Sequence, residues 1–127
     1  MKVKFNVCLC DDEDTRFFGE GPYRLLCGIR DYGSLRTAAQ NMGMAYTKAF
    51  GLIKRAETTL GFSLTQRTIG GKGGGGSVLT EGAKELMMRY EAYKTACEQM
   101  AENLYNTHFS SFQPQKFADA ENKDTEQ

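Results

Sequence analysis

Two short helical segments separated by only three residues place the strongest limit on the fold of this chain. Leu35–Asn41 and a segment from about Ala45 to Leu60 both carry apolar residues at helical spacing. Ser34 is a favourable N-cap for the first segment, and Gly43 can adopt the left-handed conformation that a tight turn requires. Two helices joined so closely predict a helix-turn-helix.

Two strand-like runs follow these helices directly. Ser63–Ile69 and Ser77–Leu79 are joined by residues 70–76, which hold six glycines and Lys72. A helix-turn-helix followed by a β-hairpin is the winged-helix arrangement. We therefore predict an α+β, mainly α fold, with a winged helix-turn-helix over residues 21–80 that begins with a helix from Pro22 to about Tyr32.

Residues 1–20 precede this region and predict a β-strand or hairpin. Polar and apolar residues alternate through Lys2–Cys10, with Val3, Phe5, Val7 and Leu9 on one face. The acidic Asp11–Asp14 run is expected to turn the chain, and Arg16–Phe18 to return as a second short strand.

A last helix is predicted over residues 81–108, capped by Thr80. Apolar residues recur there with a heptad spacing that is typical of a helix pair. About 26 helical residues span roughly 39 Å, more than a small domain needs, so we expect dimerisation; the alternative is a helix that only covers its own core. The seam that follows Ala83 consists of Leu86, Tyr90, Tyr93, Cys97, Met100 and Leu104. Residues 109–127 are polar and contain Pro114, and we expect a disordered tail.

A net charge of zero conceals a basic middle. Residues 21–80 carry eight basic and two acidic side chains, whereas residues 1–20 sum to −2 and residues 81–127 to −4. This asymmetry favours a polyanion-binding face, with an ordinary solvated basic surface as the alternative.

Several functional classes find little support. No apolar run approaches the length of a membrane span and no signal peptide opens the chain, so we expect a cytoplasmic protein. Cys8, Cys10, Cys27 and Cys97 lack the spacing of zinc ligands, and we expect buried, reduced thiols. The single histidine, His108, has no acid or base partner along the sequence. We predict no enzymatic activity, no metal and no cofactor.

The segment from Ala45 to Leu60 is the candidate reader of DNA. The N-terminal part of a recognition helix enters the major groove, so Tyr46, Thr47 and Lys48 are placed to contact base edges or phosphates. Phe50 could contact a thymine methyl group, or could instead pack against the hairpin.

Other residues are expected to contact the phosphate backbone. Lys54 and Arg55 follow later on the same helix, and Ser34 and Arg36 stand at the start of the preceding one. For each of them an ordinary surface role is the alternative. Lys72 is the one charge in the glycine-rich loop, whose lysine is followed by glycine and so does not match a Walker A motif. We interpret the loop as a wing tip, with a plain linker as the alternative.

These residues resemble a known family. G-S-L-R-T-A-A-Q-N-M-G-M-A-Y-T-K-A-F (Gly33–Phe50) and L-T-Q-R-T-I-G-G-K-G-G-G-G-S-V-L-T (Leu64–Thr80) resemble the N-terminal DNA-binding domain of ModE-type, molybdate-responsive regulators. That domain is itself similar to the winged helix of LysR-type regulators. The resemblance covers about residues 20–105, and the glycine-rich loop followed by V-L-T is its most specific part.

The resemblance implies a homodimeric transcription factor that binds double-stranded DNA. By position it assigns DNA contacts to Ser34, Arg36, Tyr46, Thr47 and Lys48, and basic wing contacts to Arg67 and Lys72. Full ModE regulators continue into oxyanion-binding domains, whereas this sequence ends where they would begin, so no effector is assigned.

We therefore predict sequence-specific binding of double-stranded DNA by a homodimeric transcriptional regulator. One alternative is a winged-helix module that binds a partner protein and no DNA. Another is a small-molecule-binding protein that uses the glycine-rich loop.

Overall fold

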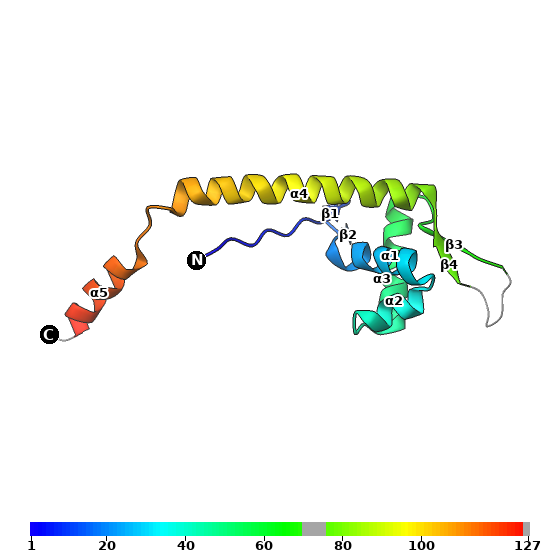
Figure 1. The fold of residues 1–127 in the computed structure, drawn as a ribbon, viewed down its shortest axis with the longest axis horizontal. Helices are drawn as coiled ribbons and strands as arrows, with labels where there is room; N and C mark the ends of the chain where they lie inside the picture. Colours follow the sequence, from blue (N-terminus) through cyan, green and yellow to red (C-terminus); the bar gives the residue numbers. More distant parts are fainter. Residues whose placement is uncertain (70–75, 126–127) are drawn as a thin grey trace. The chain divides into compact units, whose positions relative to one another are not determined.

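The computed structural model describes residues 1–69 and 76–125 and is mainly helical (Figure 1). The chain divides into a main unit, Asn6–Lys94, and a second unit that combines Met1–Phe5 with Thr95–Gln127. The elements are β1 (Leu9–Cys10), β2 (Arg16–Phe18), α1 (Glu20–Tyr32), α2 (Leu35–Asn41), α3 (Tyr46–Leu60), β3 (Thr65–Arg67), β4 (Ser77–Leu79), α4 (Glu81–Phe109) and α5 (Pro114–Thr125).

The paired helices α2 and α3 form where the sequence predicts them. The Ser34 hydroxyl oxygen accepts the backbone N–H of Thr37 at 2.9 Å and so caps α2. Gly43 turns the chain with a φ of +64°, a conformation that an L side chain rarely adopts. Ala39 of α2 is buried, and its small side chain allows the neighbouring helices to pack closely.

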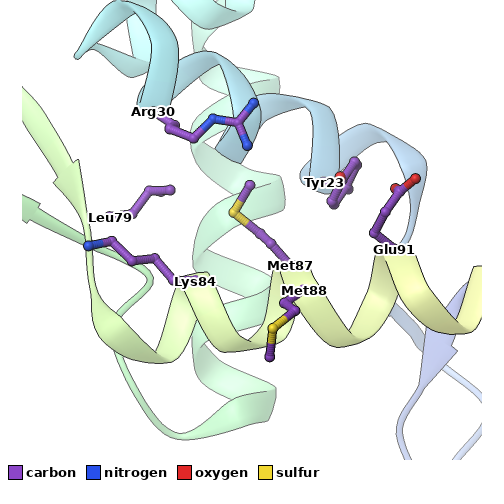
Figure 2. A pocket seen from close by; sticks show the side chains of 7 residues that line it. All are labelled: Tyr23, Arg30, Leu79, Lys84, Met87, Met88 and Glu91. Atoms are coloured by element: carbon purple, nitrogen blue, oxygen red, sulfur yellow. The ribbon is translucent and has the colours of Figure 1, made fainter.

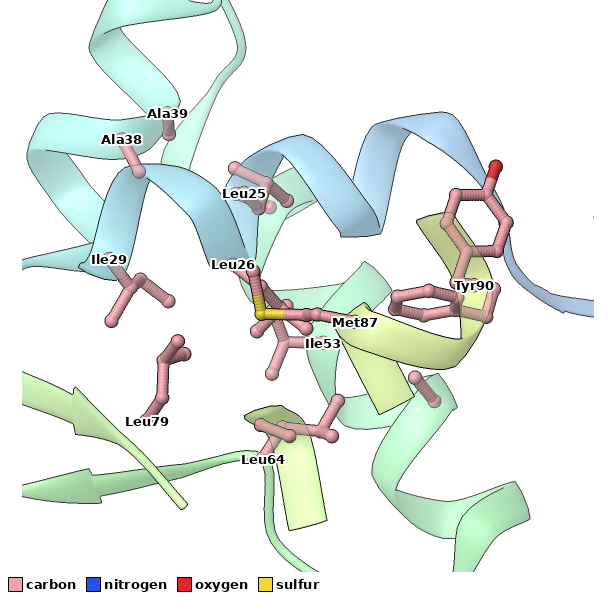
Figure 3. Packing of buried hydrophobic residues seen from close by; sticks show 14 residues of the cluster. Leu25, Leu26, Ile29, Ala38, Ala39, Ile53, Leu64, Leu79, Met87 and Tyr90 are labelled. Carbon is pink, nitrogen blue, oxygen red and sulfur yellow. The ribbon is translucent and has the colours of Figure 1, made fainter. Parts of the chain in front are cut away.

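The core of the main unit lies between α1, α2, α3, the β3–β4 hairpin and the first turns of α4 (Figure 3). Gly28 of α1 allows α2 to approach closely, because a Cβ at this position would lie 2.5 Å from the Cβ of Ala38. The largest fully buried side chains are Phe18, Leu25, Leu26, Ile29 and Leu64.

The β3–β4 hairpin is fastened to the helices at its base. β3 and β4 pair antiparallel, with Arg67 opposite Ser77. The Ser77 N–H donates to the carbonyl of Gly33 at the end of α1, at 2.8 Å. Thr80 caps α4 as predicted, because its hydroxyl accepts the N–H of Ala83 at 3.1 Å.

The N-terminal strand is much shorter than predicted. Only Leu9–Cys10 pairs with Arg16–Phe18, with an irregular register, and Val3 and Phe5 are exposed. A partner strand of three residues cannot pair with a nine-residue run. The predicted acidic turn is present, because the Asp11 carboxylate accepts backbone N–H groups of Glu13 and Thr15.

Tyr90 occupies a different place from the dimer seam that the heptad predicts. It is 3% exposed, its hydroxyl donates to the carbonyl of Val7 at 2.9 Å, and its ring meets Phe18 edge-on. Leu86 also packs against the core. The first turns of α4 therefore bury their apolar face in the main unit, and the seam is exposed only further along the helix.

The cysteines correct another expectation. All four are free thiols, but Cys8 and Cys10 are exposed rather than buried, since the strand that would cover them is short. Cys27 and Cys97 are partly buried.

The second unit contains a helix where a disordered tail was expected. α5 begins at Pro114, which suits the first turn of a helix because its missing N–H needs no partner there. The Gln115 side chain donates to the carboxylate of Asp119 at 3.0 Å, and Phe117 stacks on Phe112 with centroids 6.3 Å apart. The polar composition from which a disordered tail was predicted does not reveal these local contacts.

Candidate nucleic-acid interface

The helix α3 buries one face and exposes the face that carries the candidate contacts. Ala49, Ile53 and Ala56 are buried against the core. The side chains predicted to contact DNA are all exposed; they are Tyr46, Thr47, Lys48, Phe50, Lys54 and Arg55. The apolar stripe thus fixes the rotation of α3 and turns the polar residues outward.

Four side chains of α2 and α3 form a stacked row. The guanidinium carbon of Arg36 lies 4.4 Å from the centroid of the Tyr46 ring, and the Lys54 ammonium lies 5.4 Å from that of Phe50. The Tyr46 and Phe50 rings are 6.1 Å apart. Since both rings are partly exposed, at 38% and 45%, the row places two cations over aromatic faces at the surface.

Lys54 also belongs to a contact that closes the turn after α3. Its ammonium lies 3.2 Å from one carboxylate oxygen of Glu57, whose other oxygen accepts the N–H of Leu64 at 2.7 Å. Both carboxylate oxygens of Glu57 therefore have partners within the fold, one of them at Leu64, the residue before β3.

The other described cations predicted to contact DNA are available for an anion. Among the side chains that the structure describes, Arg36, Lys48, Arg55 and Arg67 form no ion pair. Arg67 is exposed at the end of β3. An anion would therefore meet these groups without first displacing a carboxylate.

Two predicted contacts add nothing to this set of cations. The hydroxyl of Ser34 is already engaged, since it accepts from the Thr37 N–H and donates to the Thr37 hydroxyl at 3.1 Å. Ser34 therefore serves the fold as a cap. Lys72 lies outside the described residues.

The sequence predicted the four residues of the row as DNA contacts, but it did not predict that their side chains lie against one another. The spacing of Tyr46, Phe50 and Lys54, four residues apart on one helix, is the signal that could have revealed it. The contact of Arg36 with Tyr46 depends on how α2 packs against α3, which no local spacing encodes.

A separate cavity of about 290 Å³ lies between α1, α4 and β4 (Figure 2). Its cations are already paired, Arg30 with Asp31 and Lys84 with Glu81. Burial raises the pKa of the Tyr23 phenol in its wall, and a hydrogen bond to Glu91 raises it further. The lining residues are Tyr23, Arg30, Leu79, Lys84, Met87, Met88 and Glu91.

Residues 1–69 and 76–125 contain no cluster of three or more side chains that could bind a metal ion. None of their helices combines the length and the apolar character needed to cross a bilayer.

Part of the chain is similar to curated regulators. It is 39% identical over 74 residues to the molybdenum transport protein ModE of Herbaspirillum seropedicae, which covers 58% of this chain and 26% of that protein. It is 36% identical over 67 residues to the DNA-binding transcriptional dual regulator ModE of Escherichia coli K12, covering 53% of this chain and 26% of the relative.

A third relative is the molybdenum-pterin-binding protein MopB of Rhodobacter capsulatus, 34% identical over 68 residues, 54% of this chain and 25% of that protein. No family model matches the chain. The chain spans about a quarter of the length of these relatives. The similarities confirm the resemblance to the DNA-binding region of ModE-type regulators.

Proposed function

We propose that the Asn6–Lys94 unit contains a winged helix-turn-helix, over residues 21–80, that binds double-stranded DNA. In this arrangement α3 enters the major groove and the β3–β4 hairpin lies along the backbone. The observation that carries the proposal is the exposed face of α3, on which Thr47, Lys48 and Arg55 stand beside the row that begins at Arg36. Its cations are not neutralised by carboxylates of the described residues, apart from Lys54, which pairs with Glu57.

The relatives support a role in transcription. The Escherichia coli relative is named a DNA-binding transcriptional dual regulator, and this chain shares 36% of 67 residues with it. We extend that role to this protein as a sequence-specific transcriptional regulator. No molybdenum-dependent step is assigned to this chain, since it spans only about a quarter of the relatives whose names mention molybdenum.

The regulator is proposed to act as a homodimer. Beyond the turns that pack against the core, α4 exposes Met100 at 63% and Leu104 at 54%, with Cys97 partly buried on the same stripe. An apolar stripe with heptad spacing on a helix surface is suited to a second copy of the same helix. Two copies would present two α3 helices to two half-sites of a duplex.

A second candidate is a module that binds a partner protein. The exposed rings of Tyr46 and Phe50 favour it, since aromatic side chains are enriched where proteins meet. The cations that flank these rings favour DNA, because phosphates provide many more negative charges than an average protein surface.

Selection of duplexes from a randomised pool distinguishes the two candidates. A sequence-specific DNA-binding protein enriches a motif, and binds it about a thousand-fold or more tightly than random duplex. A protein-interaction module enriches no motif. The selection uses the full chain, and competition with single-stranded DNA of the enriched sequence verifies that the duplex form is bound.

A further inference from the structure

Gly51 is an exposed glycine in the interior of α3, and no contact among the described residues explains it. A Cβ built at this position would meet no atom within 4 Å. Its φ is not in the left-handed range that favours glycine. Glycine inside a helix is less stable than alanine, because it loses more backbone freedom on folding.

Two other glycines of the main unit have clear structural reasons. Gly61 ends α3 with a φ of +84°, which strains any other residue. Gly28 lies where a Cβ would be 2.5 Å from the Cβ of Ala38. Gly51 meets neither condition, so the fold would accept a larger residue there.

The neighbours of Gly51 are the candidate DNA contacts. Side chains three and four positions away are the nearest on a helix surface. For Gly51 these are Thr47, Lys48, Lys54 and Arg55, all of them exposed. The glycine is therefore a gap at the centre of three cations and a hydroxyl.

We infer that Gly51 is the position at which α3 approaches the base edges of the duplex most closely, an inference that rests on the proposed DNA binding. The long side chains of Lys48 and Arg55, which form no ion pair, can reach phosphates that flank the major groove, whereas Lys54 is paired with Glu57. The bare backbone at their centre lets a base edge, with a projecting group such as a thymine methyl, come into van der Waals contact with the helix. Gly51 thereby determines specificity by excluding bulk rather than by donating a hydrogen bond.

The test uses the full chain, the duplex that the wild-type protein enriches, and a random duplex of equal length. Gly51→Ala is expected to weaken binding to the enriched duplex by roughly 10-fold, the usual effect of one lost base contact, and Gly51→Leu by more. Binding to the random duplex should change by less than about two-fold, since the phosphate contacts remain. The melting temperature should rise in both variants, because alanine and leucine are better helix formers.

Gly21→Ala is the matched control. Gly21 also lies in a helix, α1, and a Cβ there meets only Leu52 at an ordinary 3.9 Å. Gly21→Ala should leave binding to both duplexes unchanged. Full binding of the enriched duplex by Gly51→Leu, or a lower melting temperature in Gly51→Ala, would overturn the inference about Gly51. Failure of the wild-type protein to enrich any duplex would instead overturn the proposed function.

Discussion

The guanidinium of Arg36 lies over the ring of Tyr46, with 4.4 Å between the Arg36 Cζ and the ring centroid. The contact joins α2 to α3 at the surface, and under the proposed DNA binding it holds a cation where a phosphate would approach. A surface arginine otherwise samples many rotamers, and ordering it on binding costs free energy. The ring of Tyr46 reduces that cost by orienting Arg36 beforehand.

Removal of the ring should therefore weaken DNA binding. Tyr46→Ala is expected to lose about 1 kcal/mol, or about five-fold in Kd, the value of an exposed cation–π contact. Tyr46→Phe keeps the ring and should bind within about two-fold of the wild-type protein. Fluorescence anisotropy with a labelled duplex measures both. Equal losses in the two variants would show that the hydroxyl, and not the ring, is what matters.

Close packing of α1 on α2 should make Gly28 sensitive to substitution. Gly28→Ala adds a Cβ that would lie 2.5 Å from the Cβ of Ala38, and overpacking of this kind destabilises a core by about 1–3 kcal/mol. Urea unfolding followed by circular dichroism measures the loss. Adding Ala38→Gly should recover part of it, because the opposing Cβ is removed. A Gly28→Ala protein as stable as the wild type would contradict the packing described for these helices.

The hydrogen bond from Tyr90 to the Val7 carbonyl should stabilise the main unit. Tyr90→Phe leaves that carbonyl without this donor, and we expect a loss of about 1 kcal/mol in the free energy of unfolding at neutral pH. Tyr32→Phe, at an exposed position, is the control and should cost nothing measurable.

Stability should also fall at alkaline pH. Burial raises the pKa of Tyr90, and burial with a hydrogen bond to Glu91 raises that of Tyr23. The folded state therefore holds these protons more tightly than the unfolded chain, whose phenols titrate near pH 10. The contribution of these two protonated phenols to the free energy of unfolding is complete below about pH 10. It is lost as the pH rises through their folded-state pKa values. Unfolding measured from pH 8 to 12 should show this fall, and Tyr90→Phe should reduce it, leaving the part that is due to Tyr23.

The regions that the sequence predicts well are those where local signals and tertiary packing agree. The bounds of α2 follow from the Ser34 cap and the turn at Gly43, and both are found in the structure. The strand over Lys2–Cys10 fails because alternation predicts a strand without revealing that its partner is only three residues long. Tyr90 fits a heptad seam equally well, and only the packing of β2 and α1 against α4 shows that it faces its own core.

The exposed stripe of α4 should mediate dimerisation. Replacing Met100 and Leu104 with aspartate places two charges on the stripe, and sedimentation should then give monomers, whereas the wild-type protein should sediment as a dimer. Thr95→Asp with Asn106→Asp adds the same charges on the opposite side of the helix and should leave the dimer intact. A monomeric wild-type protein, or a dimer that tolerates both substitutions of the stripe, would contradict the proposed seam.

The salt dependence of duplex binding tests the DNA-binding face most directly. Cations that neutralise phosphates release counterions, so the logarithm of the binding constant should fall steeply with the logarithm of salt concentration. Lys48→Ala and Arg55→Ala should each reduce that slope by about one unit. Arg89→Ala, which removes an exposed cation of α4 paired with Glu85, should leave it unchanged. Absence of duplex binding at low salt, or a slope that Lys48→Ala and Arg55→Ala do not alter, would contradict the assignment of α3 as the DNA-binding helix.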